Sequence, residues 1–116
     1  MLVGALLGLM EQLALNIITL TEESGEREFF DSRITRAQTL MMLGNLAKAA
    51  NNLPPDARAK LHQIDWDAWH GLCIALAKPD DHPLKIWVAI KELTPMTLQH
   101  LYDYKRTQPQ LFSMVM

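Results

Sequence analysis

The stretch from Leu40 to Lys78 reads LMMLGNLAKAANNLPPDARAKLHQIDWDAWHGLCIALAK, and it decides the fold class. Its apolar residues recur every three or four positions, which is the period of an α-helix. Pro54 and Pro55 interrupt the pattern, because a proline removes a backbone donor and clashes with the preceding turn. Asp65 then occupies the cap position of another helix. The stretch therefore predicts three helices: one that ends near residue 52, a short one over 56–62 and one over 66–78.

Two apolar stripes of helical period run along residues 6–20. One is Leu6, Met10, Leu13, Ile17 and Leu20, and the other is Leu7, Ala14 and Ile18. A helix that is apolar on more than one side buries more than one side. We therefore expect a partner helix, in a homodimer or in another protein, to cover an interface formed by Leu6, Leu7, Met10 and Ala14. The alternative is that the first nine residues fray or cover an edge of the chain's own core.

The remainder of the chain is also helical in pattern. Pro83 suits the first position of a helix, and Thr94-Pro95 either starts a new helix or kinks the existing one. Gly44 lies inside a predicted helix, where we expect it to allow a neighbouring helix to come close. The prediction is an all-α domain, a bundle of four to five helices over residues 1–106, followed by a loose tail over 107–116.

Composition limits the classes of function. The 116 residues are 49% hydrophobic, enough for one domain with a real core, and the net charge of -2 gives no general attraction to nucleic acid. Residues 1–31 are acidic and the remainder is mildly basic. The apolar start MLVGALLGLM lacks a preceding cation and is followed by Glu11, so we expect a buried helix rather than a signal or membrane segment. We therefore predict a cytoplasmic protein.

Few residues suggest chemistry. Cys73 is the single cysteine, so no intrachain disulfide forms, and its apolar neighbours predict a small buried side chain. The four histidines lie on separate segments, and the loop Asp80-Asp81-His82 is more typical of a solvated cap than of a metal site. We predict no metal and no cofactor. Possible RNA contacts come from two basic pairs, which also suit solvated surfaces and helix ends: Arg58, Lys60, Lys105 and Arg106.

Several short motifs together resemble the HepT-like family of the HEPN superfamily, over roughly residues 10–105. They are Leu43-Gly44-Asn45-Leu46-Ala47-Lys48, Leu53-Pro54, Ile64-Asp65-Trp66, Gly71-Leu72 and Ile86-Trp87. The resemblance implies a HEPN-like bundle that dimerises, here through the first helix and a central cleft. It also implies a ribonuclease toxin that is neutralised by a small nucleotidyltransferase encoded beside it.

The charged positions of the family motif differ in this chain. Cys73 stands where the family has an arginine, Ile74 where it has a polar residue, Lys78 near the place of its histidine, and Asn45 where it has an acid. We expect these four residues to line a degenerate cleft. The leading interpretation is a catalytically degenerate binding or regulatory partner of a nucleotidyltransferase-type protein, with RNA as the second choice of ligand. The alternatives are an active ribonuclease that uses Lys78 with His82, and a structural protein-interaction module.

Overall fold

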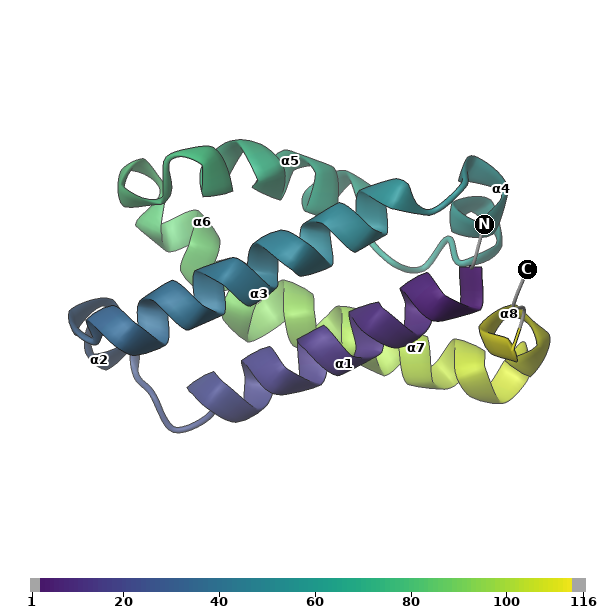
Figure 1. Cartoon of the computed structure of the whole chain (residues 1–116), viewed down its shortest axis with the longest axis horizontal. Coiled ribbons are helices and arrows are strands. Elements are labelled where there is room, and N and C mark those ends of the chain that lie inside the picture. The colour runs from purple at the N-terminus through teal and green to yellow at the C-terminus, as the bar shows by residue number, and fades with distance from the viewer. Residues whose placement is uncertain (1–2, 114–116) are drawn as a thin grey trace.

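The computed structural model describes residues 3–113, and within this range every regular element is helical, which confirms the all-α prediction. Four longer helices form the frame: α1 (Val3–Thr21), α3 (Arg33–Asn52), α5 (Trp66–Ala77) and α7 (Thr94–Thr107). Figure 1 shows α3 between α1 and α5, with α7 running behind α1. The shorter elements are α2 (Glu26–Asp31), α4 (Pro55–Lys60), the 3-10 turn η1 (Pro79–Asp81), α6 (Pro83–Val88), the π-helical turn η2 (Ala89–Leu93) and α8 (Pro109–Ser113).

Local sequence signals set several of these boundaries. The carboxylate of Asp65 accepts a hydrogen bond of 3.0 Å from the backbone N–H of Ala68, so Asp65 caps α5 as predicted. Pro55 and Pro83 occupy the first positions of α4 and α6, where a missing N–H costs nothing. The predicted starts of α5 and α6 are therefore confirmed.

Helix α1 lies inside the chain's own core. Leu7, Met10 and Ala14 have no exposed surface, and Leu6 is half-buried. Because α3 covers one side of α1 and α7 covers another, each apolar stripe has buried members without a second chain, while Leu6, Leu13, Ile18 and Leu20 are half-buried. The prediction that Leu7, Met10 and Ala14 form a dimer interface is therefore wrong, and Leu6 alone of that set keeps partial exposure.

The helical path continues through Thr94-Pro95. Val88, Ala89, Leu93 and Thr94 all have right-handed helical backbone angles, and η2 forms a wide π turn just before Pro95. A π turn changes which carbonyl each N–H meets, so it accommodates a proline that has no N–H to offer. The predicted new start at Thr94 is therefore wrong, and the alternative of one continuing but distorted helix is the nearer one, with the distortion taking the form of a π turn.

The region after residue 107 is not a loose tail within the described range. Helix α8 packs on α1 and α7, and the side chain of Leu111 is only 4% exposed. Leu111 is thus part of the core cluster, and the half-buried Phe112 packs against it. Residues 114–116 of the predicted tail lie outside the described residues, as do residues 1 and 2.

Gly44 does not serve a close helix–helix approach. A Cβ built on this glycine would meet no heavy atom within 4 Å. The sequence-based expectation for Gly44 is therefore wrong, because the space beside it is open rather than filled by a neighbouring helix.

By length and composition, α1 could also cross a membrane, a property that it shares with core helices and signal sequences. In the structure it packs into a compact molecule whose radius of gyration is 14.1 Å, close to the ~13 Å typical of a folded chain of this length. Packing into a compact molecule agrees with the predicted buried helix, and the cytoplasmic location stays a prediction.

Candidate functional site

Two grooves lie on either side of α5. The first, which we call the α3–α5 groove, has a volume of about 390 Å³ and is lined by Gly44, Ala47, Lys48, Asn51, Asn52, Cys73, Leu76 and Ala77. The second, which we call the α5–α6 groove, has a volume of about 430 Å³ and is lined by Asp65, Asp67, Ala68, Gly71, Leu72, Lys85, Val88, Ala89, Glu92, Leu93 and Met96. Helix α5 therefore presents one side to each groove.

Cys73 lies on the wall of the α3–α5 groove and is exposed, which corrects the prediction of a buried thiol. The side-chain amide of Asn51 donates a hydrogen bond of 3.0 Å to its sulfur. The thiol in turn lies 3.7 Å from the carbonyl oxygen of Trp69, one turn earlier in α5. The apolar neighbours misled the prediction because the buried side of α5 is set by Trp69, Leu72 and Ala75.

The four residues predicted to line one degenerate cleft do not share a site. Cys73 lines the α3–α5 groove, whereas Asn45 lines a separate hollow between α1 and α3. Ile74 is 70% exposed, and Lys78 is an exposed cap residue at the end of α5. Within a single chain, the four residues therefore do not line one hollow, and the predicted cleft between two subunits stays a prediction.

Lys78 and His82, the weak catalytic candidates, flank the short turn η1. His82 is half-buried at the start of α6 and lines a hollow whose other members are Asp81, Pro83, Leu84, Lys85 and Val88. The cation in this hollow is therefore Lys85 rather than Lys78. Sequence reasoning missed Lys85 because it considered only the spacing of the family motif.

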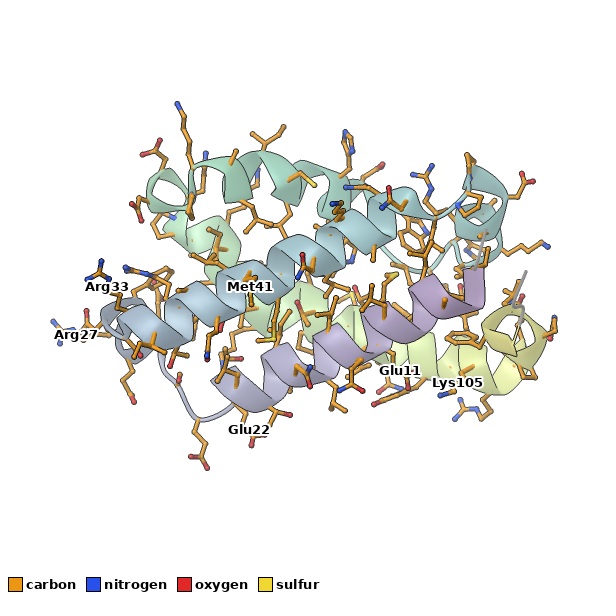
Figure 2. The ribbon with its side chains drawn as sticks, in the orientation of Figure 1. Glu11, Glu22, Arg27, Arg33, Met41 and Lys105 are labelled. Atoms are coloured by element: carbon orange, nitrogen blue, oxygen red, sulfur yellow. The ribbon has the colours of Figure 1, made fainter. Side chains whose placement is uncertain are left out.

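Two of the four predicted RNA contacts, Lys105 and Arg106, form ion pairs with acidic side chains. Lys105 lies 3.3 Å from the carboxylate of Glu11 (Figure 2), and Arg106 lies 3.0 Å from that of Asp103. On α4, Lys60 is exposed, whereas the Nε atom of Arg58 is buried and has no hydrogen-bond partner among the described residues. Within residues 3–113, no three His, Cys, Asp or Glu side chains come close enough to hold a metal ion.

The lining of the α5–α6 groove combines small and apolar residues with charged ones. Small and apolar residues of α5 and η2, including Ala68, Gly71 and Ala89, form its lining, and charged groups join them at Asp67, Lys85 and Glu92. A Cβ built on Gly71 would meet no heavy atom within 4 Å. The groove is thus open at the point where α5 has no side chain.

Exposed apolar side chains gather beside this groove. Val88 and Met96 line it and are 39% and 55% exposed, and Leu84, one turn before Val88, is 66% exposed. Ile74, one turn after Gly71 on α5, is 70% exposed. Single exposed apolar residues are ordinary, but such a group beside a groove is typical of an interaction surface. The signal available in the sequence was the pair Leu84 and Val88 at a spacing of four.

Compared with known proteins, the chain matches no protein-family model, no curated protein and no solved structure. The resemblance to the HepT-like family therefore remains a hypothesis that depends on the motifs quoted above.

Proposed function

We propose that this protein is a helical binding protein without ribonuclease activity, and that the α5–α6 groove is where a protein partner docks. The observation that carries the proposal is the open groove at Gly71, which is lined mostly by small and apolar residues and includes the exposed Val88 and Met96. An apolar centre with charges at its edge is the usual anatomy of a protein–protein interface. An RNA site would instead need a basic surface.

The chemistry of the other candidate residues supports a binding role. Cleavage of a phosphodiester needs a group that stabilises phosphate charge and a group that transfers protons at one site. At the family's motif positions this chain has the uncharged Cys73 and Ile74. Lys78 and His82 stand at opposite ends of η1, and neither forms a side-chain hydrogen bond or ion pair among the described residues.

The resemblance to the HepT-like family favours a regulatory role in a toxin–antitoxin-type system. On this hypothesis the protein is a degenerate member that binds a nucleotidyltransferase-type protein and forms a homodimer. Because three of the four α1 residues expected at the dimer interface are buried in the chain's own core, any dimer must use another surface. RNA remains the second choice of ligand, through the surface that carries Lys60.

The test of the proposal is incubation of the purified, folded protein with transfer RNA and bulk RNA. We expect no cleavage by the wild-type protein or by a Lys78→Ala/His82→Ala double mutant. Cleavage by the wild type that is lost in the double mutant would contradict the proposal and identify a ribonuclease with substitute residues. Cleavage that both proteins show equally, and that persists after repurification, would also contradict the proposal and place the active residues elsewhere in the chain.

One observation favours the ribonuclease alternative, namely that His82 and Lys85 line the same hollow. A lysine beside an imidazole could neutralise a phosphate while the imidazole transfers a proton. A His82→Ala/Lys85→Ala double mutant therefore belongs in the same assay. If wild-type cleavage is lost in this mutant but kept in Lys78→Ala, the active pair is His82 and Lys85.

A further inference from the structure

We propose that the α5–α6 groove binds a basic amphipathic helix of another protein. The apolar side of that helix would lie on the small and apolar lining residues, and its lysines or arginines would lie beside the acids of the groove. The inference rests on the proposed function, because it takes the groove to be the surface where a protein partner docks. It adds the secondary structure and the charge of the segment that binds there.

The charges of the groove favour a cationic ligand. Its lining carries the carboxylates of Asp65, Asp67 and Glu92 and the ammonium group of Lys85, which together have a net charge of -2. All four residues are exposed, and none of them forms an ion pair within residues 3–113. The chain itself therefore does not neutralise these acids, and a partner that supplies positive charge is complementary to them.

The same charges disfavour three other occupants. A nucleic acid or an anionic membrane surface would bring phosphate groups next to the three acids. A second copy of this chain, packed about a two-fold axis, would bring its own groove and with it the same net negative charge. Like charges placed opposite one another across an interface cost free energy. A basic segment of a different protein is thus the occupant that the charges favour.

The composition of the lining indicates that the bound segment is a helix. An added strand needs an exposed sheet edge, and no strand is present within the described residues. A proline-rich segment needs aromatic side chains to dock against, and no aromatic residue lines the groove. An amphipathic helix needs an apolar groove, and the small and apolar residues of α5, α6, η2 and the start of α7 provide one.

The exposed apolar residues of the lining suit a helix better than a small molecule. Val88 and Met96 are 39% and 55% exposed, so the groove is shallow. A small ligand would keep much of its surface in water there, whereas pockets for small molecules bury most of the ligand. Met96 follows Glu92 by four residues, or about one helical turn. An apolar side chain and a basic side chain one turn apart on a partner helix could therefore contact both.

The experiment measures, by fluorescence anisotropy, the binding of two labelled synthetic peptides to the full-length protein. One peptide is an amphipathic helix of leucine, alanine and lysine, about 18 residues long so that it can form a helix in water. The other is identical except that glutamate replaces every lysine. We expect the lysine peptide to bind at least about tenfold more tightly at low salt, and the difference to shrink as salt screens the charges.

Charge reversal within the groove tests the site. Asp67→Lys/Glu92→Lys should weaken binding of the lysine peptide about tenfold or more and strengthen binding of the glutamate peptide, because the lining becomes net positive. Asp65 is left unchanged because it caps α5. The matched control is Glu22→Lys/Asp56→Lys, which changes the net charge of the chain equally at two exposed residues outside the groove lining. The control should bind the lysine peptide within about twofold of the wild type, since salt screens distant charges.

A second pair of variants tests the groove without a change in charge. A Cβ built on Gly71 or on Gly44 would meet no heavy atom within 4 Å, and leucine is a good helix former, so we expect both leucine variants to fold. Gly71→Leu places a side chain in the α5–α6 groove and should weaken binding of the lysine peptide about tenfold or more, because the side chain obstructs the partner. Gly44→Leu places the same side chain in the α3–α5 groove and should leave binding unchanged. Circular dichroism checks that all the variants are folded.

Four results would overturn the inference: no binding of the lysine peptide, equal binding of the two peptides, a groove reversal that changes binding no more than its control, or equal binding by Gly71→Leu and Gly44→Leu. These failures are distinct from failure of the proposed function. A protein that leaves RNA intact but does not bind the lysine peptide contradicts the basic-helix inference and not the binding role. A protein that cleaves RNA contradicts the proposed function whichever peptide it binds.

Discussion

At the scale of single residues, two buried threonines show how much a hydrogen-bond partner matters. Thr97 and Thr39 are 1% and 0% exposed. The indole N–H of Trp69 donates a buried hydrogen bond of 3.0 Å to the hydroxyl of Thr97. The hydroxyl of Thr39 has no partner among the described residues. The same side chain therefore stabilises the fold at one position and costs desolvation energy at the other.

We expect Thr97→Val to lower the free energy of unfolding by about 1–3 kcal/mol, because it leaves the buried indole N–H of Trp69 unpaired. Thr39→Val removes a hydroxyl that already lacks a partner, so it should be neutral or stabilising. Urea denaturation of the two variants beside the wild type measures both effects. Equal losses at the two positions would show that packing, rather than hydrogen bonding, sets the cost.

At the scale of elements, α5 contributes most to the candidate sites, because it forms a wall of both grooves. Its start depends on Asp65, whose carboxylate pairs with the otherwise free N–H of Ala68. We expect Asp65→Ala to lower the free energy of unfolding by about 1 kcal/mol. Asp67→Ala, which removes a first-turn acid that does not cap, should cost a few tenths of a kcal/mol through the helix dipole. Thermal denaturation distinguishes the two, and equal losses would mean that charge rather than capping stabilises α5.

The connection from α6 to α7 shows the limit of local signals within an element. The pair Thr94-Pro95 is compatible with a break, a kink or a bulge, and sequence spacing does not separate these outcomes. The structure has a π turn there, with Thr94 completely buried and Pro95 within a continuous helical path. Burial of η2 between its neighbours decides the outcome, because a break would remove Ala89 and Ile90 from the core.

At the scale of the whole molecule, α8 closes the core against α1 and α7. We expect Leu111→Ala to lower the free energy of unfolding by about 2–3 kcal/mol, since it opens a cavity at a buried position. Met41→Ala is the matched control, because Met41 is 63% exposed on the outer side of α3 (Figure 2) and its loss should stay within about 0.5 kcal/mol. No effect at Leu111 would mean that the segment after Thr107 is not part of the core.

Predictions of individual elements succeeded where the signal was local. The cap at Asp65 and the proline start of α6 each follow from a few neighbouring residues. Predictions that placed residues from different helices at one site failed within a single chain, because the sequence does not give the distances between those helices. Asn45 and Cys73 fall on different sides of α3, and sequence spacing carries no information about which helices cover which side.

The sequence by itself determined the all-α class, most helix boundaries and the apolar residues available for a core. The reason is that the apolar periodicity, the capping residues and the prolines each influence the backbone within one or two helical turns. The tertiary structure decided which apolar residues are buried inside the chain and which stay exposed. On α1, the stripe residues Leu7, Met10, Ala14 and Ile17 are fully buried in the core. On α6, Leu84 and Val88 stay exposed. The physical reason is that burial depends on the neighbours a helix acquires on folding, and α1 has neighbours on two sides while α6 has an open groove beside it.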